Sequence, residues 1–263
     1  MELASGKLIR DEPADGVVRL RIANPQRRGA LDHEILDTLA ETVAGLDARC
    51  LVLTGSDRVF SAGYDLGNLE DRKFEESAER LVAHPFHDAL EALEAYRYPV
   101  IAQINGHAIG GGLELALTCD IRLAASDVRV GMPPAKLGLV YSHTGLSKFV
   151  NLCGPANTAE LFYVGRNVDA ERGLAMGLFN QVVAPDELDS LTVAMAGEIA
   201  ANAPLSLAGN KRVLREIRAH ASALPEDVER ELIELRESCF RTEDLREGVR
   251  AFAEKRPPVW RGR

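Results

Sequence analysis

The sequence predicts an α/β protein in which a strand-and-helix unit is repeated and a helical region follows. Two apolar runs of strand length, residues 50–55 and 99–106, each lead into a turn of small residues and then into a helical pattern. From about residue 155 onward the pattern is almost wholly helical. We therefore expect a layered spiral core over residues 1–200 and a helical region over residues 201–263.

The N-terminal elements follow from local patterns. Residues 16–23, GVVRLRIA, alternate apolar and polar side chains as a half-buried strand does, and residues 24–30, NPQRRGA, follow as a turn. Residues 31–47 repeat apolar side chains at helical spacing, with Asp32 as a candidate N-cap. Residues 120–132, DIRLAASDVRVGM, predict two further short strands.

The remaining chain predicts helices with clear starts. Pro185, Pro204 and Pro225 each stand where a helix should begin, because proline fits the first helical turn. Residues 67–96, between the two repeated units, are charged at first and then helical in pattern, and their early part is a candidate for a mobile flap. A helical tail after a strand-rich core is suited to packing against a neighbouring subunit.

Composition limits the classes of function. The 263 residues are 46% hydrophobic and 27% charged, which fits one large domain or a core with an appended subdomain. The net charge is −9 and no block of Lys or Arg exists, so we expect no nucleic-acid partner. No run of about 18 apolar residues exists and the N-terminus is acidic, so we expect no membrane span, no signal peptide and a cytoplasmic location.

Metal and disulfide chemistry are not expected. His84, His87 and Asp88 are ligand-type residues, but no second cluster completes a site. The cysteines are widely spaced without a CxxC pair, which predicts reduced and mostly buried thiols. They are Cys50, Cys119, Cys153 and Cys239.

The strongest local signal is the triplet Gly110, Gly111 and Gly112, which precedes a helical stretch with Glu114 in its first turn. The spacing fits neither a P-loop nor a dinucleotide fingerprint. Backbone N–H groups without neighbouring Cβ atoms suit an oxyanion, although a turn that needs glycine for close packing is the alternative. Residues 60–66, FSAGYDL, have the same character, so two adjacent turns could each lend one N–H to a single oxygen.

These segments together resemble the enoyl-CoA hydratase/isomerase (crotonase) superfamily. The resemblance rests on FSAGYDL, INGHAIGGGLELALTCDIRLAA, NPQRRGALD, GRNVDAERGLAMGLFNQVV and NAPLSLAGNKRVL, and it spans most of the chain. It implies a ClpP-like spiral of ββα units that binds acyl-CoA thioesters and assembles as trimers or dimers of trimers. Coenzyme A would enter as part of the substrate, with no other cofactor, and residues 201–263 would serve oligomerisation and cover the active site.

The resemblance also implies roles for single residues. The amides of Ala62 and Gly111 would hold the thioester oxygen, and Arg27 or Arg28 would meet a phosphate of CoA unless both are ordinary surface arginines. The implied substrate-binding residues are Ala62, Gly63, Tyr64, Asp65, Gly110 and Pro134.

Glu114 matches the first of the two glutamates with which hydratases activate water and deliver a proton. Its place in the first helical turn should favour the carboxylate form. Pro134 stands where these enzymes carry the second glutamate, and proline can neither give nor take a proton. A positioned acid or base contributes a factor of about 10² to 10⁴, so a hydratase without it should be slow or altered.

Tyr141 supports a rival chemistry. Residues 134–141, PAKLGLVY, are similar to a pattern of methylmalonyl-CoA decarboxylases, where the tyrosine lies in the active site. Decarboxylation needs no general base, because loss of carbon dioxide generates the enolate directly. A neutral phenol could orient the carboxylate or help protonate the product, and a packing role is the alternative.

We therefore expect an acyl-CoA enzyme of the hydratase/isomerase type with Glu114 as acid and base. Two alternatives stay open: a decarboxylase of methylmalonyl- or ethylmalonyl-CoA that uses Tyr141, and a catalytically weak member that only binds acyl-CoA. A serine hydrolase is not expected, because Ser142 and His143 are adjacent and point in opposite directions in an extended segment.

Overall fold

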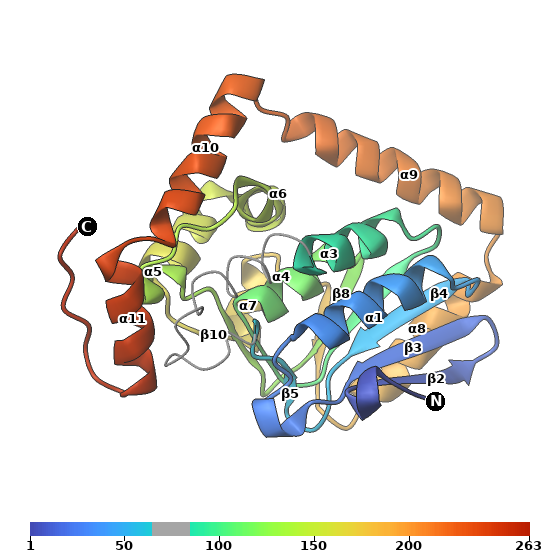
Figure 1. Ribbon diagram of the computed structural model, residues 1–263. Coiled ribbons are helices and arrows are strands. Elements are labelled where there is room, and N and C mark those ends of the chain that lie inside the picture. The colour runs from blue at the N-terminus through green and yellow to red at the C-terminus, as the bar shows by residue number, and fades with distance from the viewer. Residues whose placement is uncertain (65–84) are drawn as a thin grey trace.

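Two β-sheets form the centre of the structure, a computed structural model that describes residues 1–64 and 85–263 (Figure 1). The described strands form one sheet in the order β1-β2-β3-β4-β6-β8-β11 and a smaller one in the order β10-β9-β7-β5. The strands are β1 (Glu2–Leu3), β2 (Leu8–Ala14), β3 (Val17–Ile22), β4 (Cys50–Thr54), β5 (Val59–Ser61), β6 (Val100–Ile104), β7 (His107–Ile109), β8 (Ile121–Ala125), β9 (Arg129–Gly131), β10 (Val168–Asp169) and β11 (Gln181–Val183).

Helices cover both sheets and make up most of the C-terminal half. The side chain of Asp32 accepts a hydrogen bond from the amide of Ile35 at 2.9 Å, so the predicted N-cap is confirmed. The helices are η1 (Ala4–Gly6), η2 (Pro25–Arg27), α1 (His33–Ala44), α3 (Pro85–Ala95), α4 (Gly111–Thr118), α5 (Pro134–Leu137), α6 (His143–Ala159), η3 (Glu160–Val164), α7 (Ala170–Ala175), α8 (Leu188–Ala201), α9 (Pro204–Ala221), α10 (Glu226–Cys239) and α11 (Glu243–Ala253).

The predicted repeat is present as pairs of strands. β4, β6 and β8 lie side by side and parallel in the large sheet, and each is followed by a short strand, β5, β7 or β9, in the small sheet. Each repeat therefore gives one strand to each sheet before the chain continues into the next turn of the spiral. The α/β spiral with a helical C-terminal region is confirmed.

Some elements differ from the sequence prediction. β2 was not predicted, because Asp11 and Glu12 interrupt its apolar pattern; Arg19 on β3 satisfies Asp11 through an ion pair of 2.5 Å. α6 begins at His143, well before residue 155, and bends at Gly154 (φ 74°) ahead of Pro155. Polar residues in its first turn conceal this start. Pro204 and Pro225 lie at helix starts as predicted, whereas Pro185 lies in the turn before α8.

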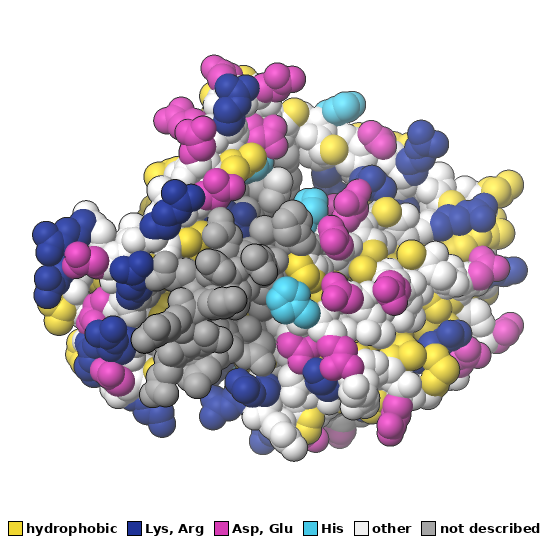
Figure 2. Space-filling view, in the orientation of Figure 1, with side chains coloured by type: hydrophobic (Ala, Val, Ile, Leu, Met, Phe, Trp, Pro, Cys, Tyr) yellow, Lys and Arg dark blue, Asp and Glu magenta, His cyan; other side chains and the backbone are white. Residues whose placement is uncertain are grey.

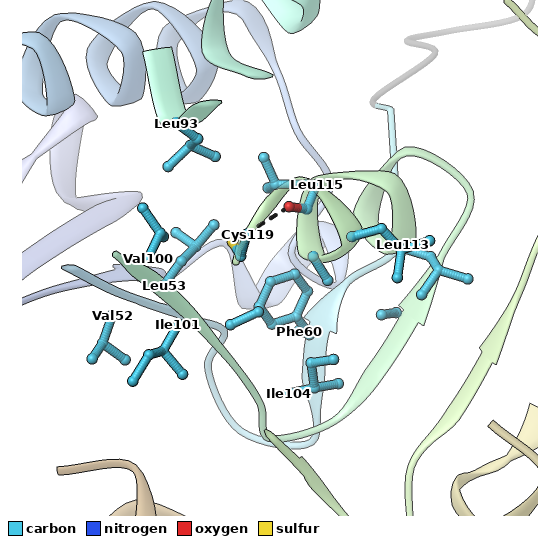
Figure 3. Packing of buried hydrophobic residues seen from close by; sticks show 14 of the residues in the cluster. Val52, Leu53, Phe60, Leu93, Val100, Ile101, Ile104, Leu113, Leu115 and Cys119 are labelled. Atoms are coloured by element: carbon cyan, nitrogen blue, oxygen red, sulfur yellow. Dashed lines mark hydrogen bonds between the residues drawn. The ribbon is translucent and has the colours of Figure 1, made fainter. Parts of the chain in front are cut away.

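Helix α4 lies at the centre of the hydrophobic core, and each of its residues is buried. Figure 3 shows Leu113 and Leu115 of α4 with Phe60 and Ile104, which come from both sheets. The Cys119 thiol that follows the helix donates to the carbonyl of Leu115 at 3.6 Å. All four cysteines are free and buried, as predicted. This packing fixes the N-terminus of α4, where the glycine triplet lies.

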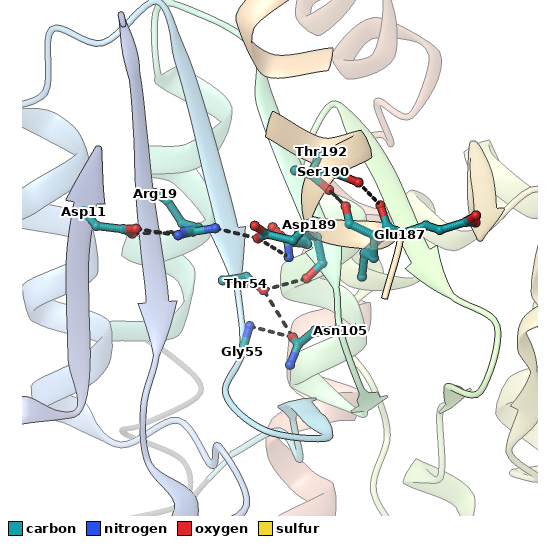
Figure 4. A network of polar contacts seen from close by, with 11 residues as sticks. Asp11, Arg19, Thr54, Gly55, Asn105, Glu187, Asp189, Ser190 and Thr192 are labelled. Atoms are coloured by element: carbon teal, nitrogen blue, oxygen red, sulfur yellow. Dashed lines mark hydrogen bonds and ion pairs between the residues drawn. The ribbon is translucent and has the colours of Figure 1, made fainter. Parts of the chain in front are cut away.

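A polar network lies on the face of the large sheet that α8 covers (Figure 4). Arg19 bridges Asp11 and Asp189, so it ties the first residues of α8 to β2 and β3. Oδ1 of Asn105 accepts from the amide of Gly55 at 2.9 Å and lies 3.2 Å from Oγ1 of Thr54. Asn105 therefore joins the ends of β4 and β6, the large-sheet strands of two neighbouring repeats.

The C-terminal helices reach back over the core. The buried Nζ of Lys211 on α9 pairs with Asp120 at 2.8 Å and donates to the carbonyls of Tyr98 and Leu93 at 2.9 and 3.2 Å. α9 then crosses above α3, α10 returns beside α6, and α11 packs on α5. No single described helix is long and apolar enough to cross a membrane; α8 and α9 meet that criterion only jointly, across a bend of 106°.

Candidate active site

Each glycine of the triplet has its own structural cause. Gly110 adopts φ +56° at the N-cap of α4, a conformation that side chains rarely adopt. A Cβ on Gly111 would lie 2.8 Å from the ring of Tyr64, and a Cβ on Gly112 would lie 2.4 Å from the carbonyl oxygen of Ser61. A positive φ at Gly110 and close packing at Gly111 and Gly112 therefore explain why this turn needs glycine.

The two predicted turns lie against each other. A Cβ on Gly63 would lie 3.1 Å from the amide nitrogen of Gly111 and 2.8 Å from the carbonyl oxygen of Ile109. Gly111 is the first residue of α4, so its N–H has no acceptor within the helix. Its amide has no backbone acceptor elsewhere in the described part of the chain.

The prediction that Ala62 supplies the second amide is not supported, because that amide already has an acceptor. The N–H of Ala62 donates to the carbonyl of Arg28 at 3.1 Å, and the N–H of Gly63 donates to Oγ of Ser61 at 3.1 Å. The first amide is therefore engaged by the neighbouring loop and the second by a side chain of its own segment. The next amide, that of Tyr64, has no acceptor among residues 1–64 and 85–263. The FSAGYDL motif alone does not reveal which of its amides the adjoining turn occupies.

Glu114 and Tyr141 are in direct contact in the interior. The two side chains are 3% and 9% exposed, and the hydroxyl of Tyr141 donates to Oε2 of Glu114. Gly145 makes room for both, because a Cβ there would lie 2.6 Å from the Tyr141 ring and 2.9 Å from Oε1 of Glu114. The sequence had suggested each residue separately, and the structure brings them together.

Burial dominates the electrostatics of this pair. It raises the pKa of Glu114, although Lys148, the hydrogen bond from Tyr141 and Arg236 all act to lower it. The expectation that the helix start would favour the carboxylate is therefore wrong in direction. Burial and the neighbouring Glu114 raise the pKa of Tyr141 well above its ordinary value, so its phenol stays protonated at neutral pH.

The side chain of Tyr64 completes the local structure. Its ring covers Gly111 and meets Phe86 edge to face at 4.8 Å between centroids. Its hydroxyl lies 3.4 Å from that of Tyr141. The sequence had suggested only a lining role for this residue, because nothing in its motif places the ring.

A cavity of about 500 Å³ leads outward from Glu114 between α3, α6, α9 and α10. On its wall Lys148 pairs with Glu94 at 2.7 Å and donates to Oγ1 of Thr118 at 3.0 Å. Sequence reasoning missed Lys148 and Gly145, since neither belongs to a recognisable motif. The lining includes apolar Leu90, Leu117, Leu152 and Leu224 besides charged groups, so an acyl chain and polar substituents could both be held there.

The other predicted residues lie around this centre. Arg27 and Arg28 are exposed in and after η2, and the backbone of Arg28 reaches the FSAGYDL turn. Pro134 is buried as the first residue of α5. Asp65 and most of the expected flap lie outside the described residues. On the face shown in Figure 2, Lys and Arg are interspersed with Asp and Glu over the described surface.

Ser142 and His143 each have a structural partner. Oγ of Ser142 caps α6 by accepting from the amide of Gly145 at 3.1 Å, while His143 pairs with Glu229 on α10 at 3.2 Å. His87 and Asp88 are exposed, and His84 falls in the part that is not described. No group of three or more His, Cys, Asp or Glu within the described ranges could hold a metal ion.

Comparison with known proteins decides the family. The model of the enoyl-CoA hydratase/isomerase family matches residues 12–263. The chain belongs to the enoyl-CoA hydratase/isomerase family. A probable enoyl-CoA hydratase of Bacillus subtilis is 33% identical over 94% of this chain and 95% of its own. A crotonyl-CoA hydratase of Syntrophomonas wolfei is 31% identical over 93% and 94%.

Among solved structures, this family member is similar to a methylmalonyl-CoA decarboxylase in complex with 2-nitronate-propionyl-CoA. The TM-score is 0.88 at 27% identity, and the match covers 98% of this chain and 99% of the other. Crotonase superfamily membership and the resemblance to methylmalonyl-CoA decarboxylase are thus confirmed. The family includes relatives with both kinds of activity in their names, so the reaction must be argued from the site.

Proposed function

We propose that this protein stabilises the enolate of an acyl-CoA thioester and that its reaction is decarboxylation of a malonyl-type acyl-CoA. One observation carries the choice of reaction: the buried Glu114 is hydrogen-bonded to Tyr141, and Pro134 stands at the expected position of a second glutamate. The thioester oxygen would be held by the amides of Tyr64 and Gly111, which have no acceptor within the described chain.

Hydration by this family's usual route needs two carboxylates around one water. Here the Glu114 carboxyl faces a phenol, and burial raises its pKa, so a smaller share of it is ionised at neutral pH than of an ordinary glutamate. Decarboxylation does not need a base. The bond between Cα and the carboxylate breaks, carbon dioxide leaves, and the electron pair forms the enolate. A proton from the Tyr141 hydroxyl then restores Cα.

The comparison with the methylmalonyl-CoA decarboxylase supports this proposal, because the similarity extends over nearly the full length of both chains. A second candidate is hydration or isomerisation with Glu114 as acid and base. It is favoured by the similarity to a crotonyl-CoA hydratase and by the position of Glu114 on the cavity wall.

A side-by-side assay of methylmalonyl-CoA and crotonyl-CoA separates the candidates. We expect the purified protein to convert methylmalonyl-CoA to propionyl-CoA with release of carbon dioxide, and to hydrate crotonyl-CoA slowly if at all. Hydration at ordinary enzyme rates without decarboxylation would favour the second candidate. If both thioesters stay unchanged while CoA compounds still bind, the protein is a catalytically weak binding member of its family.

We further propose that the protein is a homotrimer or a dimer of trimers. Large apolar side chains are exposed on two C-terminal helices: Leu205, Val213, Leu214 and Ile217 on α9, and Val228, Ile233 and Leu235 on α10. Light scattering after size-exclusion chromatography measures the assembly, and a monomer at micromolar concentration would contradict this proposal.

A further inference from the structure

The site contains a third polar side chain that the proposed reaction does not use. The hydroxyl of Tyr141 donates to Glu114, and the hydroxyl of Tyr64 lies 3.4 Å from the same Tyr141 oxygen. Glu114, Tyr141 and Tyr64 therefore form one continuous series of oxygens. The proposed function needs only the backbone amide of Tyr64, so its phenol has no assigned task.

The packing fixes this series in place. Phe86 meets the Tyr64 ring edge to face, and Phe162 meets the Tyr141 ring at 5.4 Å between centroids. Gly111 leaves room for the first ring, and Gly145 leaves room for the second. These four neighbours hold the two hydroxyl oxygens at a distance from which a slight movement would form a shorter hydrogen bond.

Access to water differs along the series. Glu114 is 3% exposed and Tyr141 is 9% exposed, whereas Tyr64 is partly exposed. Tyr64, which is partly exposed, and Glu114, which lines the cavity, are therefore the two ends of the series that can meet water. A chain of hydroxyl groups can pass a proton in steps, because each oxygen both donates and accepts.

We propose that the hydroxyl of Tyr64 returns a proton to Tyr141 after each turnover. This inference rests on the proposed function. Tyr141 gives its proton to the enolate carbon and becomes a phenolate; the Tyr64 O–H then gives its proton to the Tyr141 oxygen, and water restores the proton of Tyr64. The proton that enters the product thus comes from solvent, and Tyr64 is a positioning residue that acts through Tyr141.

The test follows successive turnovers in the Tyr64→Phe variant. Phenylalanine keeps the ring against Gly111 and Phe86 and removes only the hydroxyl. Rapid quenching with methylmalonyl-CoA measures product formed in the first turnover and afterwards. We expect the later turnovers of the variant to be slower than its own first turnover of one product per site by about 10²-fold, the low end for a positioned proton donor, whereas the unaltered protein shows no such difference. Tyr163→Phe is the matched control, because Tyr163 is 82% exposed.

Other outcomes would overturn the inference in distinguishable ways. Equal slowing of first and later turnovers would show that the hydroxyl serves binding or packing instead. Unchanged kinetics would mean that Glu114 draws its proton from the cavity and supplies Tyr141. If the unaltered protein leaves methylmalonyl-CoA unchanged, the proposed decarboxylation fails first, and the return of a proton to Tyr141 fails with it.

Discussion

The hydroxyl of Tyr141 donates a hydrogen bond to Oε2 of Glu114, joining a loop residue to a helix residue 27 positions earlier. The two partners come from different segments, so neither segment alone forms this hydrogen bond. The contact depends on Gly145, which leaves space for both groups. The carboxyl group that the sequence suggests as a lone base is therefore one member of a buried polar pair.

Replacing Glu114 by glutamine should affect stability in a pH-dependent way. Because burial raises the pKa of Glu114 above its unfolded value of 4.5, the native state holds the proton more tightly than the unfolded chain does. The wild-type protein therefore loses stability as pH rises above the unfolded pKa of Glu114. The Glu114→Gln variant has no carboxyl group at this position and does not show this loss. We expect urea unfolding to give the two proteins similar stability near about pH 4 and the variant higher stability near about pH 8.

The same substitution separates stability from catalysis. If Glu114 only supports Tyr141, the variant should retain part of its decarboxylation activity, because the amide oxygen of glutamine can still accept from the phenol. Glu41→Gln on the exposed face of α1 is the matched control and should be neutral at both pH values. A variant less stable than the wild type at both pH values would contradict the assigned cost of burying the carboxylate.

Gly111→Ala should move the Tyr64 ring. The added Cβ would lie 2.8 Å from that ring, so the ring and the adjacent amide must shift. We expect kcat/KM to fall by about 10²-fold, as when one oxyanion donor is lost, and stability to fall by about 1 to 3 kcal/mol, as for overpacking. Gly209→Ala on the open side of α9 is the control and should stabilise the helix by about 0.5 to 1 kcal/mol. Wild-type kcat/KM in Gly111→Ala would refute the placement of the site.

Lys211→Met should loosen the attachment of α9. Methionine fills much of the same space but leaves Asp120 without its cation and the carbonyls of Leu93 and Tyr98 without their donor. Breaking a buried pair in this way costs about 3 kcal/mol. Chemical unfolding measures the loss, with the exposed Arg212→Met as the control. Equal stability of the two variants would show that Lys211 does not anchor α9.

The sequence predicts the repeated architecture because strand length, small-residue turns and helical spacing are local properties. β4, β6 and α4 therefore lie where the pattern indicates. β2 escaped prediction because the pairing of Asp11 with Arg19 is a contact across strands, and a charged residue in a strand reads as a loop.

The sequence predicts individual residues of the candidate site but not the contacts between them. Motif position identifies Gly111, Glu114 and Tyr141, but the acceptor of each amide depends on the neighbouring loop. The carbonyl of Arg28 engages Ala62, which moves the available donor to Tyr64. Likewise, the pKa of Glu114 depends on burial that its helix position does not reveal.

The most direct test of the proposed function is a crystal structure with a bound, non-reactive analogue of a malonyl-type acyl-CoA. We expect the thioester oxygen within about 2.7 to 3.1 Å of the amide nitrogens of both Tyr64 and Gly111. The carboxylate of the analogue should lie beside the hydroxyl of Tyr141. A thioester oxygen bound away from these two amides, or held by the amide of Ala62, would contradict the proposal.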